Sequence, residues 1–144
     1  IPYVVLRLYQ IYGPFQKKNR LISTAIDSLI KSKIFKSSNG IQIRDFMYIS
    51  DLISLIKLIL RKRKLNQGIY NVGSGKGIQV RKILAKIKFI IKKGDIKLGD
   101  TIMRKDELLK NYPNIQKVKK EFKWSSKFSI NRGLKKTIKF YEKK

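Results

Sequence analysis

The sequence predicts an α/β fold with a few short strands and four or five helices in a chain of 144 residues. Three observations predict this class. An apolar run at residues 4–8 predicts a strand buried on both faces, as parallel strands usually are. Residues 39–75 follow the order strand, helix, strand and glycine-rich turn. Apolar residues at helical spacing indicate further helices on both sides of this segment.

The first strand is expected to end at the turn Tyr12-Gly13-Pro14. A helix should follow, opened by Asn19 or Arg20, because six apolar residues recur at helical spacing: Leu21, Ile22, Ala25, Ile26, Leu29 and Ile30. The positive end of this helix and Arg20 together can hold a phosphate. The alternative is that Arg20 is only solvated.

The central segment contains the most informative pattern. Ile43–Ile49 is rich in aromatic and β-branched residues and predicts a strand. Ser50 is the expected N-cap of the next helix, and Asp51 places a negative charge in its first turn. That helix should end near Arg61 and be buried on most sides, because its apolar residues surround it: Leu52, Ile53, Leu55, Ile56, Ile59 and Leu60.

A second strand is expected at Ile69–Val72, and it runs into Gly73-Ser74-Gly75. Glycine permits backbone conformations and close approaches that side chains forbid.

Arg44 is the strongest candidate for a binding residue. An arginine within an apolar strand is costly to bury without an anionic partner, and its planar fork suits bidentate binding of phosphate. The neighbouring Asp45 offers a structural alternative, an ion pair that orients the guanidinium. Tyr48 faces either the site or the core, and the sequence leaves both open.

The C-terminal half predicts three more helices. Apolar spacing indicates helices over 79–91, with Gly94 behind it, over 115–122, and from Ser129 to Tyr141. A short strand should lie at 96–98. Trp124 is expected to anchor the final helix. Asp106 and Glu107 are adjacent and point apart on a helix, so they are expected to be substrate-loop or capping residues.

The net charge of +26, from 35 Lys and Arg against 9 Asp and Glu, raises the alternative of a basic nucleic-acid-binding protein. The basic residues are scattered along the chain, and aromatic residues do not interleave with them as on a single-strand-binding surface. The excess of Lys over Arg and of Ile over Val is typical of an AT-rich genome. We therefore expect no specific nucleic-acid partner, but a general attraction for anionic ligands.

The chain has no Cys and no His, which excludes disulfides, thiol chemistry and the usual Cys/His zinc sites. Lysine interrupts every apolar run before it reaches the length of a membrane span, so no membrane partner is expected. A cytoplasmic location is the expectation.

Several motifs, in order along the chain, resemble the extended short-chain dehydrogenase/reductase family. These are LRLYQIYGP at 6–14, the helix start at 19–22, RDFMYISDL at 44–52, YNVGSG at 70–75, Arg104, FKW at 122–124 and INRGLKKTIKFY at 130–141. Members of that family are NAD(P)-dependent nucleotide-sugar epimerases, dehydratases and reductases. The resemblance covers nearly the whole chain.

The resemblance implies the C-terminal, substrate-binding portion of a Rossmann-type enzyme. Residues 1–14 would be the last part of the Rossmann sheet, and residues 15–144 the nucleotide-sugar-binding region. The chain begins with Ile1 and lacks both the Gly-x-Gly-x-x-Gly fingerprint and the Tyr-x-x-x-Lys signature, so we expect a fragment whose N-terminal dinucleotide-binding domain is missing. The run GSGKG at 73–77 lacks the fingerprint's spacing. This fragment alone is expected to be inactive.

The resemblance also implies residue roles. Arg44 and Arg104 would contact the substrate diphosphate, and Arg20 and the Leu21 backbone the nucleotide. Gln10, where the family usually has Asn, would lie near sugar or cofactor. Tyr48 is a further substrate-binding candidate, and the residues expected near NAD or NADP are Tyr9, Gln10 and Tyr12. Ordinary packing is the alternative for Tyr9 and Tyr12. The full-length protein would be a homodimer, and a non-catalytic relative remains an alternative.

Overall fold

The computed structural model describes residues 3–143, which form five helices and eight strands, and it confirms the α/β class. The helices are α1 (Leu21–Ile30), α2 (Ile49–Arg61), α3 (Val80–Ile91), α4 (Gln116–Phe122) and α5 (Ile130–Glu142). The strands are β1 (Val4–Leu8), β2 (Gln10–Tyr12), β3 (Ile34–Ser37), β4 (Ile43–Tyr48), β5 (Gly68–Val72), β6 (Gly77–Gln79), β7 (Asp95–Leu98) and β8 (Lys110–Asn111).

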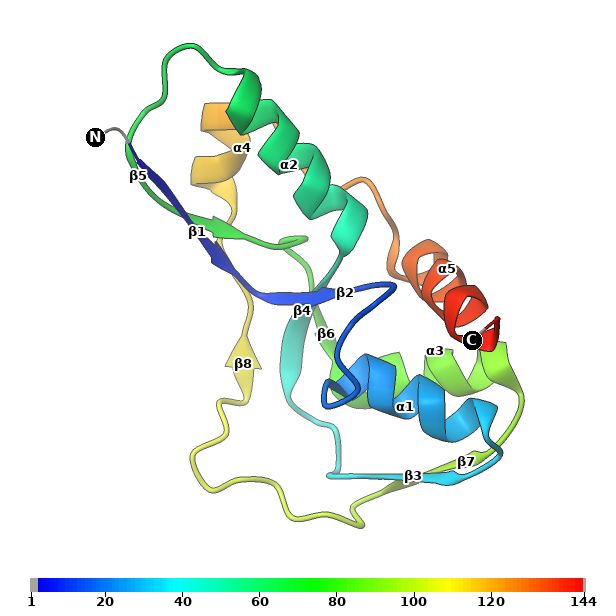
Figure 1. Cartoon of the computed structure of the whole chain (residues 1–144). Helices are drawn as coiled ribbons and strands as arrows, with labels where there is room; N and C mark the ends of the chain where they lie inside the picture. Colours follow the sequence, from blue (N-terminus) through cyan, green and yellow to red (C-terminus); the bar gives the residue numbers. More distant parts are fainter. Residues whose placement is uncertain (1–2, 144) are drawn as a thin grey trace.

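Strand β4 runs through the middle of the molecule (Figure 1) and has the most pairing partners. It pairs in parallel with β2 and β8 and antiparallel with β6. Two separate parallel pairs, β1 with β5 and β3 with β7, complete the strand pattern. The site residues on β4 are therefore positioned by three segments that are far apart in sequence.

Side chains of β4 alternate between two hydrophobic cores, as the twofold period of a strand requires. Phe46 and Tyr48 belong to the first core, which α1, α3 and α5 build. Met47, between them, belongs to the second core, which lies between α2, α4 and the β1–β5 pair. In Figure 1 α2 and α4 lie above β4, and α1, α3 and α5 lie to its right.

The β1–β5 pair is parallel, as predicted, but the expected burial of β1 on both faces is wrong for this chain. Val5 and its register partner Ile69 are roughly half exposed. The reason is that α2 and α4 cover only the face that carries Tyr70 and Val72.

Helix α2 begins at Ile49, one residue before the predicted cap, and its N-cap residue Tyr48 makes no side-chain capping bond. Ser50 is therefore not the cap. The carboxylate in the first turn of α2, that of Asp51, is buried. It accepts hydrogen bonds from Ser126 Oγ (2.8 Å) and the backbone N–H groups of residues 127 and 128 (3.0 and 3.1 Å). These bonds attach the start of α2 to the segment that leads into α5.

The prediction that α2 is buried on most sides is also wrong. Leu52 and Leu55 face the second core, whereas Ile53, Ile56 and Leu60 are exposed. The helix is amphipathic with an additional apolar outer face, and hydropathy alone does not tell which of two apolar faces is covered.

The other helices follow the sequence pattern, apart from the place of Trp124. Ser129 caps α5 by accepting from Arg132 N–H (3.3 Å), which confirms the predicted helix start. Trp124 packs in the second core, where its Nε1 donates to Ser54 Oγ (2.8 Å). It therefore anchors the segment before α5 to α2 and does not anchor α5 itself.

Among the described residues, no helix is both long and apolar enough to cross a bilayer. Residues 3–143 also contain no group of three or more acidic side chains that could hold a metal ion.

Candidate functional site

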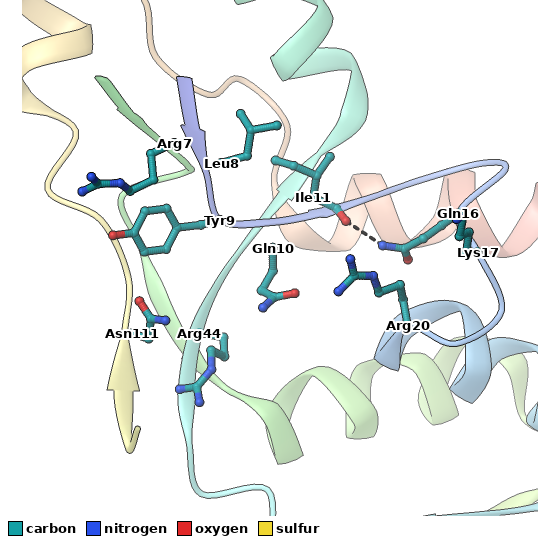
Figure 2. Close-up of a pocket in the computed structure, with 10 residues that line it drawn as sticks. All are labelled: Arg7, Leu8, Tyr9, Gln10, Ile11, Gln16, Lys17, Arg20, Arg44 and Asn111. Atoms are coloured by element: carbon teal, nitrogen blue, oxygen red, sulfur yellow. Dashed lines mark hydrogen bonds between the residues drawn. The ribbon is translucent and has the colours of Figure 1, made fainter. Parts of the chain in front are cut away.

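A cavity of about 690 Å³ opens where β1 passes into β2, next to the start of α1 and the middle of β4. Figure 2 shows the side chains of this basic pocket coming from segments that are distant in sequence. Its lining residues are Arg7, Leu8, Tyr9, Gln10, Ile11, Gln16, Lys17, Arg20, Arg44 and Asn111. Four of the predicted site residues, Tyr9, Gln10, Arg20 and Arg44, thus meet in one cavity.

Arg44 comes from β4 and is only 8% exposed. Its Nη1 donates to the carbonyl oxygen of Ile43 (2.7 Å), and its Nη2 forms an ion pair with Glu107 Oε1. The backbone of Arg44 pairs with Asn111 of β8. The prediction that a buried arginine here needs an anionic partner is confirmed, and Glu107 is that partner.

The other side of the pocket is formed by the loop that leads into α1. Ser23 Oγ donates to the carbonyl oxygens of Lys17 (2.6 Å) and Arg20 (3.0 Å), which holds this loop against the helix. Gln16 Nε2 donates to the carbonyl oxygen of Ile11 (2.6 Å), a bond drawn in Figure 2. Arg20 is the N-cap residue of α1, and the first turn of that helix has no acidic residue. The helix start is therefore suited to an anion.

The pocket is strongly positive. Four cationic side chains line it, and none of its lining residues is acidic: the cations are Arg7, Lys17, Arg20 and Arg44. Arginine forks bind phosphate oxygens in pairs, and a concave basic surface concentrates anions from solution. The arrangement suits a ligand that carries two or more adjacent negative charges.

Asp45 does not pair with Arg44, so the structural alternative considered for this pair is wrong. Its carboxylate is fully buried and accepts backbone hydrogen bonds from Ser74 N–H (2.8 Å), Gly75 N–H (2.6 Å) and Lys76 N–H (3.2 Å). The turn comes this close because Gly73 has no side chain: a Cβ there would lie 2.9 Å from Asp45 Oδ2. The amides of the GSGKG run therefore hold an internal carboxylate and are not available to a nucleotide phosphate.

The remaining predicted residues lie outside the pocket lining. Leu21 is the first residue of α1 and packs against the first core. Arg104 is exposed in the segment between β7 and β8. Tyr48 and Tyr12 are buried in the first core, with their ring centroids 5.7 Å apart, and Tyr12 Oη donates to the carbonyl oxygen of Ile130 (3.3 Å).

Sequence reasoning missed several residues that the structure brings to the site. Arg7 belongs to β1, and its place on the pocket follows from which way the strand faces, which an uninterrupted apolar run does not reveal. Asn111 belongs to β8, a strand of two residues with no recognisable sequence pattern. Glu107 was expected to be a substrate-loop or capping residue, but its ion pair with Arg44 was not predicted. Lys17 is one of many lysines, and nothing in the sequence distinguishes it.

Burial of Tyr12 should make stability depend on pH above neutrality. Burial first, and then the nearby charges of Tyr48 and Asp51, raise the pKa of the Tyr12 phenol far above 10. The unfolded chain therefore loses this proton near pH 10 while the folded chain keeps it, so stability falls as pH rises beyond that point. We expect Tyr12→Phe to remove a slope of up to about 1.4 kcal/mol per pH unit.

The measurement compares the free energies of unfolding of the wild type and Tyr12→Phe in urea at pH 8 and pH 11. The free energy of unfolding of the wild type should fall relative to that of Tyr12→Phe at pH 11, because Tyr12 ionises in the unfolded wild type. Lysine titration affects both proteins equally. An equal difference at both values would contradict the buried phenol.

Solved structures resemble this chain over nearly its whole length. A dTDP-glucose 4,6-dehydratase from Bacillus anthracis in complex with NAD matches 97% of the chain and 44% of that protein, with 26% identity and a TM-score of 0.84. A UDP-glucose 4-epimerase from Thermotoga maritima with UDP-glucose matches 98% of the chain and 46% of that protein, with 26% identity and a TM-score of 0.81.

Sequence comparison leads to the same group of proteins. The CDP-abequose synthase of Salmonella muenchen is 32% identical over 143 residues, which cover 97% of this chain and 48% of that protein. The chain thus spans about half the length of that curated relative. The sequence pattern of the NAD dependent epimerase/dehydratase family matches residues 1–73. Because this match includes half of the chain, the chain belongs to the NAD-dependent epimerase/dehydratase family.

Proposed function

We propose that this chain is the nucleotide-sugar-binding part of a longer NAD(P)-dependent epimerase, dehydratase or reductase, and that its basic pocket holds the diphosphate of the substrate. The observation that carries the proposal is a cavity lined by four cations, one of which is the nearly buried Arg44. A diphosphate offers paired oxygens at the spacing that an arginine fork prefers.

The relatives support the chemical class of the ligand. Their names combine a nucleoside diphosphate with a sugar, as in the UDP-glucose of the Thermotoga maritima structure. The sugar, the base and the choice among the three reactions differ between them, so the proposal is limited to the group that they share, the diphosphate.

We assign roles within the site on the same basis. Arg44 and Arg104 would bind the diphosphate, Arg20 and the Leu21 backbone the nucleotide, and Gln10 the sugar or the cofactor. In Figure 2 the Gln10 side chain lies between those of Arg44 and Arg20. Tyr48 would act only indirectly, through the core beneath β4.

The cofactor, NAD or NADP, fits this chain only in part. Tyr9 and Gln10 line the pocket and offer an aromatic ring and an amide, whereas Tyr12 is only 2% exposed. The turn at 73–76 is occupied by Asp45, so it provides no cradle for the cofactor's pyrophosphate. Most of the cofactor site would belong to a dinucleotide-binding domain, and residues 1–144 alone would be inactive.

We place that domain against β1. Residues 1–14 would be the last part of its Rossmann sheet and residues 15–144 the nucleotide-sugar-binding region. Within residues 3–143, β1 pairs only with β5, so its other edge is open. The half-exposed apolar face around Val5 and Ile69, and the outer face of α2 around Ile53 and Leu60, would be covered in the longer protein. That protein would be a homodimer.

The test is calorimetric titration of this chain with UDP, CDP and dTDP at fixed ionic strength. Arg44→Ala should raise the Kd of every nucleoside diphosphate that binds, by about 10- to 150-fold, because a charged hydrogen bond contributes about 1.5–3 kcal/mol. Arg44→Lys, which keeps the charge but loses the fork, should fall between the two.

Arg61→Ala is the matched control, since Arg61 is exposed at the end of α2 and does not line the pocket. It removes the same charge and should change Kd less than about threefold. Equal effects of Arg44→Ala and Arg61→Ala, or no binding of any of the three nucleotides, would refute the proposed function.

A further inference from the structure

A second cavity, of about 530 Å³, is lined by the turn at 73–76, the start of α3 and the segment that leads into α5. Its volume lies in the range of small-molecule sites. The cavity shares no lining residue with the basic pocket, and the proposed function gives it no role. We call it the lysine cavity, because three lysines line it: Lys76, Lys82 and Lys127.

The lysine cavity has a positive lining. The described residues that form it include no acid. The three lysines are exposed, and none of them forms an ion pair within residues 3–143. Beside the cavity, Arg132 Cζ lies 4.6 Å from the ring centroid of Phe128, which adds a further positive charge. Since no carboxylate pairs with the three amines, an anion that enters the cavity is attracted by all of them.

Two walls of the cavity are held in place by buried aspartates. Asp45 accepts hydrogen bonds from Lys76 N–H (3.2 Å) and from the N–H groups of residues 74 and 75. Asp51 accepts them from Lys127 N–H (3.0 Å) and from residues 126 and 128. Neither aspartate lines the cavity. The backbones of two of the three lysines are therefore fixed before a ligand arrives, which lowers the cost of ordering the site.

An apolar surface lies next to the amines. It is formed by Phe46 of β4, Ile78 of β6, and Phe128 and Ile130 at the start of α5. Phe46 belongs to the first core, and the other three side chains pack against that core, so this surface is also fixed. An apolar or aromatic group that enters the cavity would remove part of it from water.

The three amines favour one kind of anionic group. An ammonium is a compact point charge that does not select the paired oxygens an arginine fork prefers, so a single phosphate can satisfy it. A monophosphate carries about 1.5 to 2 negative charges at neutral pH, whereas a carboxylate carries one, so the phosphate gains more from three amines.

We propose that the lysine cavity is a second ligand site, which binds an organic monophosphate with an apolar or aromatic body. The phosphate contacts the lysines, and the body covers the apolar surface beside them. This site does not depend on the proposed function, which concerns other residues and a diphosphate.

Phenyl phosphate is a probe of this class, and inorganic phosphate is the same kind of anion without the ring. Calorimetric titration of the chain at constant ionic strength should give a Kd for phenyl phosphate at least about tenfold lower than for inorganic phosphate, because the ring removes apolar surface from water. Equal affinities, or no binding of phenyl phosphate, would refute the proposal.

Lys82→Gln combined with Lys127→Gln removes one charge from each of two walls. This double variant should raise the Kd of phenyl phosphate about five- to twentyfold, because each exposed amine contributes a modest charged contact. Lys119→Gln with Lys120→Gln is the matched control, since both lysines are exposed on α4 and line neither the lysine cavity nor the basic pocket. The control should change Kd less than about twofold. Equal losses in the two double variants would reflect only the overall charge and would overturn the proposal.

Arg44→Ala separates the lysine cavity from the basic pocket. It should leave the Kd of phenyl phosphate within about twofold of the wild-type value. If Arg44→Ala abolishes binding of phenyl phosphate and the Lys82 and Lys127 double variant retains it, the probe binds in the basic pocket, so the second site is refuted while the proposed function stands. A loss confined to that double variant supports the second site even if no nucleoside diphosphate binds. Thermal unfolding shows that each protein is folded.

Discussion

Replacing Asp45 by alanine is expected to lower the free energy of unfolding by about 3–4 kcal/mol, because three backbone N–H groups lose a charged acceptor at once. The carboxylate is completely buried, and of the three amides only Lys76 N–H has a second acceptor, Ser74 Oγ (3.2 Å). Asp45→Asn, which keeps the size and one acceptor oxygen, should lose about half as much. Urea unfolding followed by circular dichroism measures all three proteins.

Asp106→Ala is the control for the loss of one acidic residue in a chain of net charge +26. Asp106 is exposed, so its removal should change stability by less than about 0.5 kcal/mol. An Asp45→Ala protein as stable as Asp106→Ala would mean that the turn does not depend on the carboxylate.

Replacing Leu134 by alanine should cost about 3–4 kcal/mol, an effect of similar size with a different cause. Leu134 lies on α5, has no exposed surface, and fills the first core between α5 and its neighbours. Truncation removes three carbon atoms and leaves a cavity that the surrounding helices fill only in part. The midpoint of urea unfolding should fall while the denaturant slope stays the same.

The chain supplies a control of the same residue type. Leu60 also lies on a helix, but it is 79% exposed, so Leu60→Ala should change stability by less than about 0.5 kcal/mol. A loss at Leu60 as large as that at Leu134 would show that the outer face of α2 is covered in solution, for example by self-association, which sedimentation would reveal.

The helices were predictable because each has an apolar stripe that satisfies one simple period. For α5, the stripe and the Ser129 cap gave the start and the buried face correctly. For α2 the stripe was too wide, and the sequence did not distinguish Leu52, which packs on the second core, from Ile53, which is exposed. Burial depends on what lies opposite a face, and that information is not local.

The short strands were largely invisible for a related reason. Strands β2, β6 and β8 have two or three residues each and exist only because β4 provides hydrogen-bond partners for them. No period can be recognised in so few residues. Trp124 was assigned to the wrong helix because its partner, Ser54, is 70 residues away.

The candidate site was predictable only where burying a single residue is costly enough to require a partner. Arg44 was identified because a charge in an apolar strand requires a partner, and the structure supplies one. The identity of that partner was not predictable. Asp45 is adjacent in sequence, but its carboxylate accepts hydrogen bonds from the turn at 73–76 and does not pair with Arg44. Which acid meets which donor is decided by strand pairing across the whole chain.

The pairing of β4 also sets an order of events during translation. Domains generally fold as units, and the N-terminal part of a chain leaves the ribosome first. β4 can meet β2 early, but its hydrogen bonds to β6 and β8 wait until residues 79 and 111 have been synthesised. The Asp51 carboxylate has no hydrogen bonds from residues 126–128 until these residues have been synthesised. The arginine-bearing strand therefore spends much of its synthesis incompletely paired, and a pause or truncation before residue 111 would leave it exposed to misfolding.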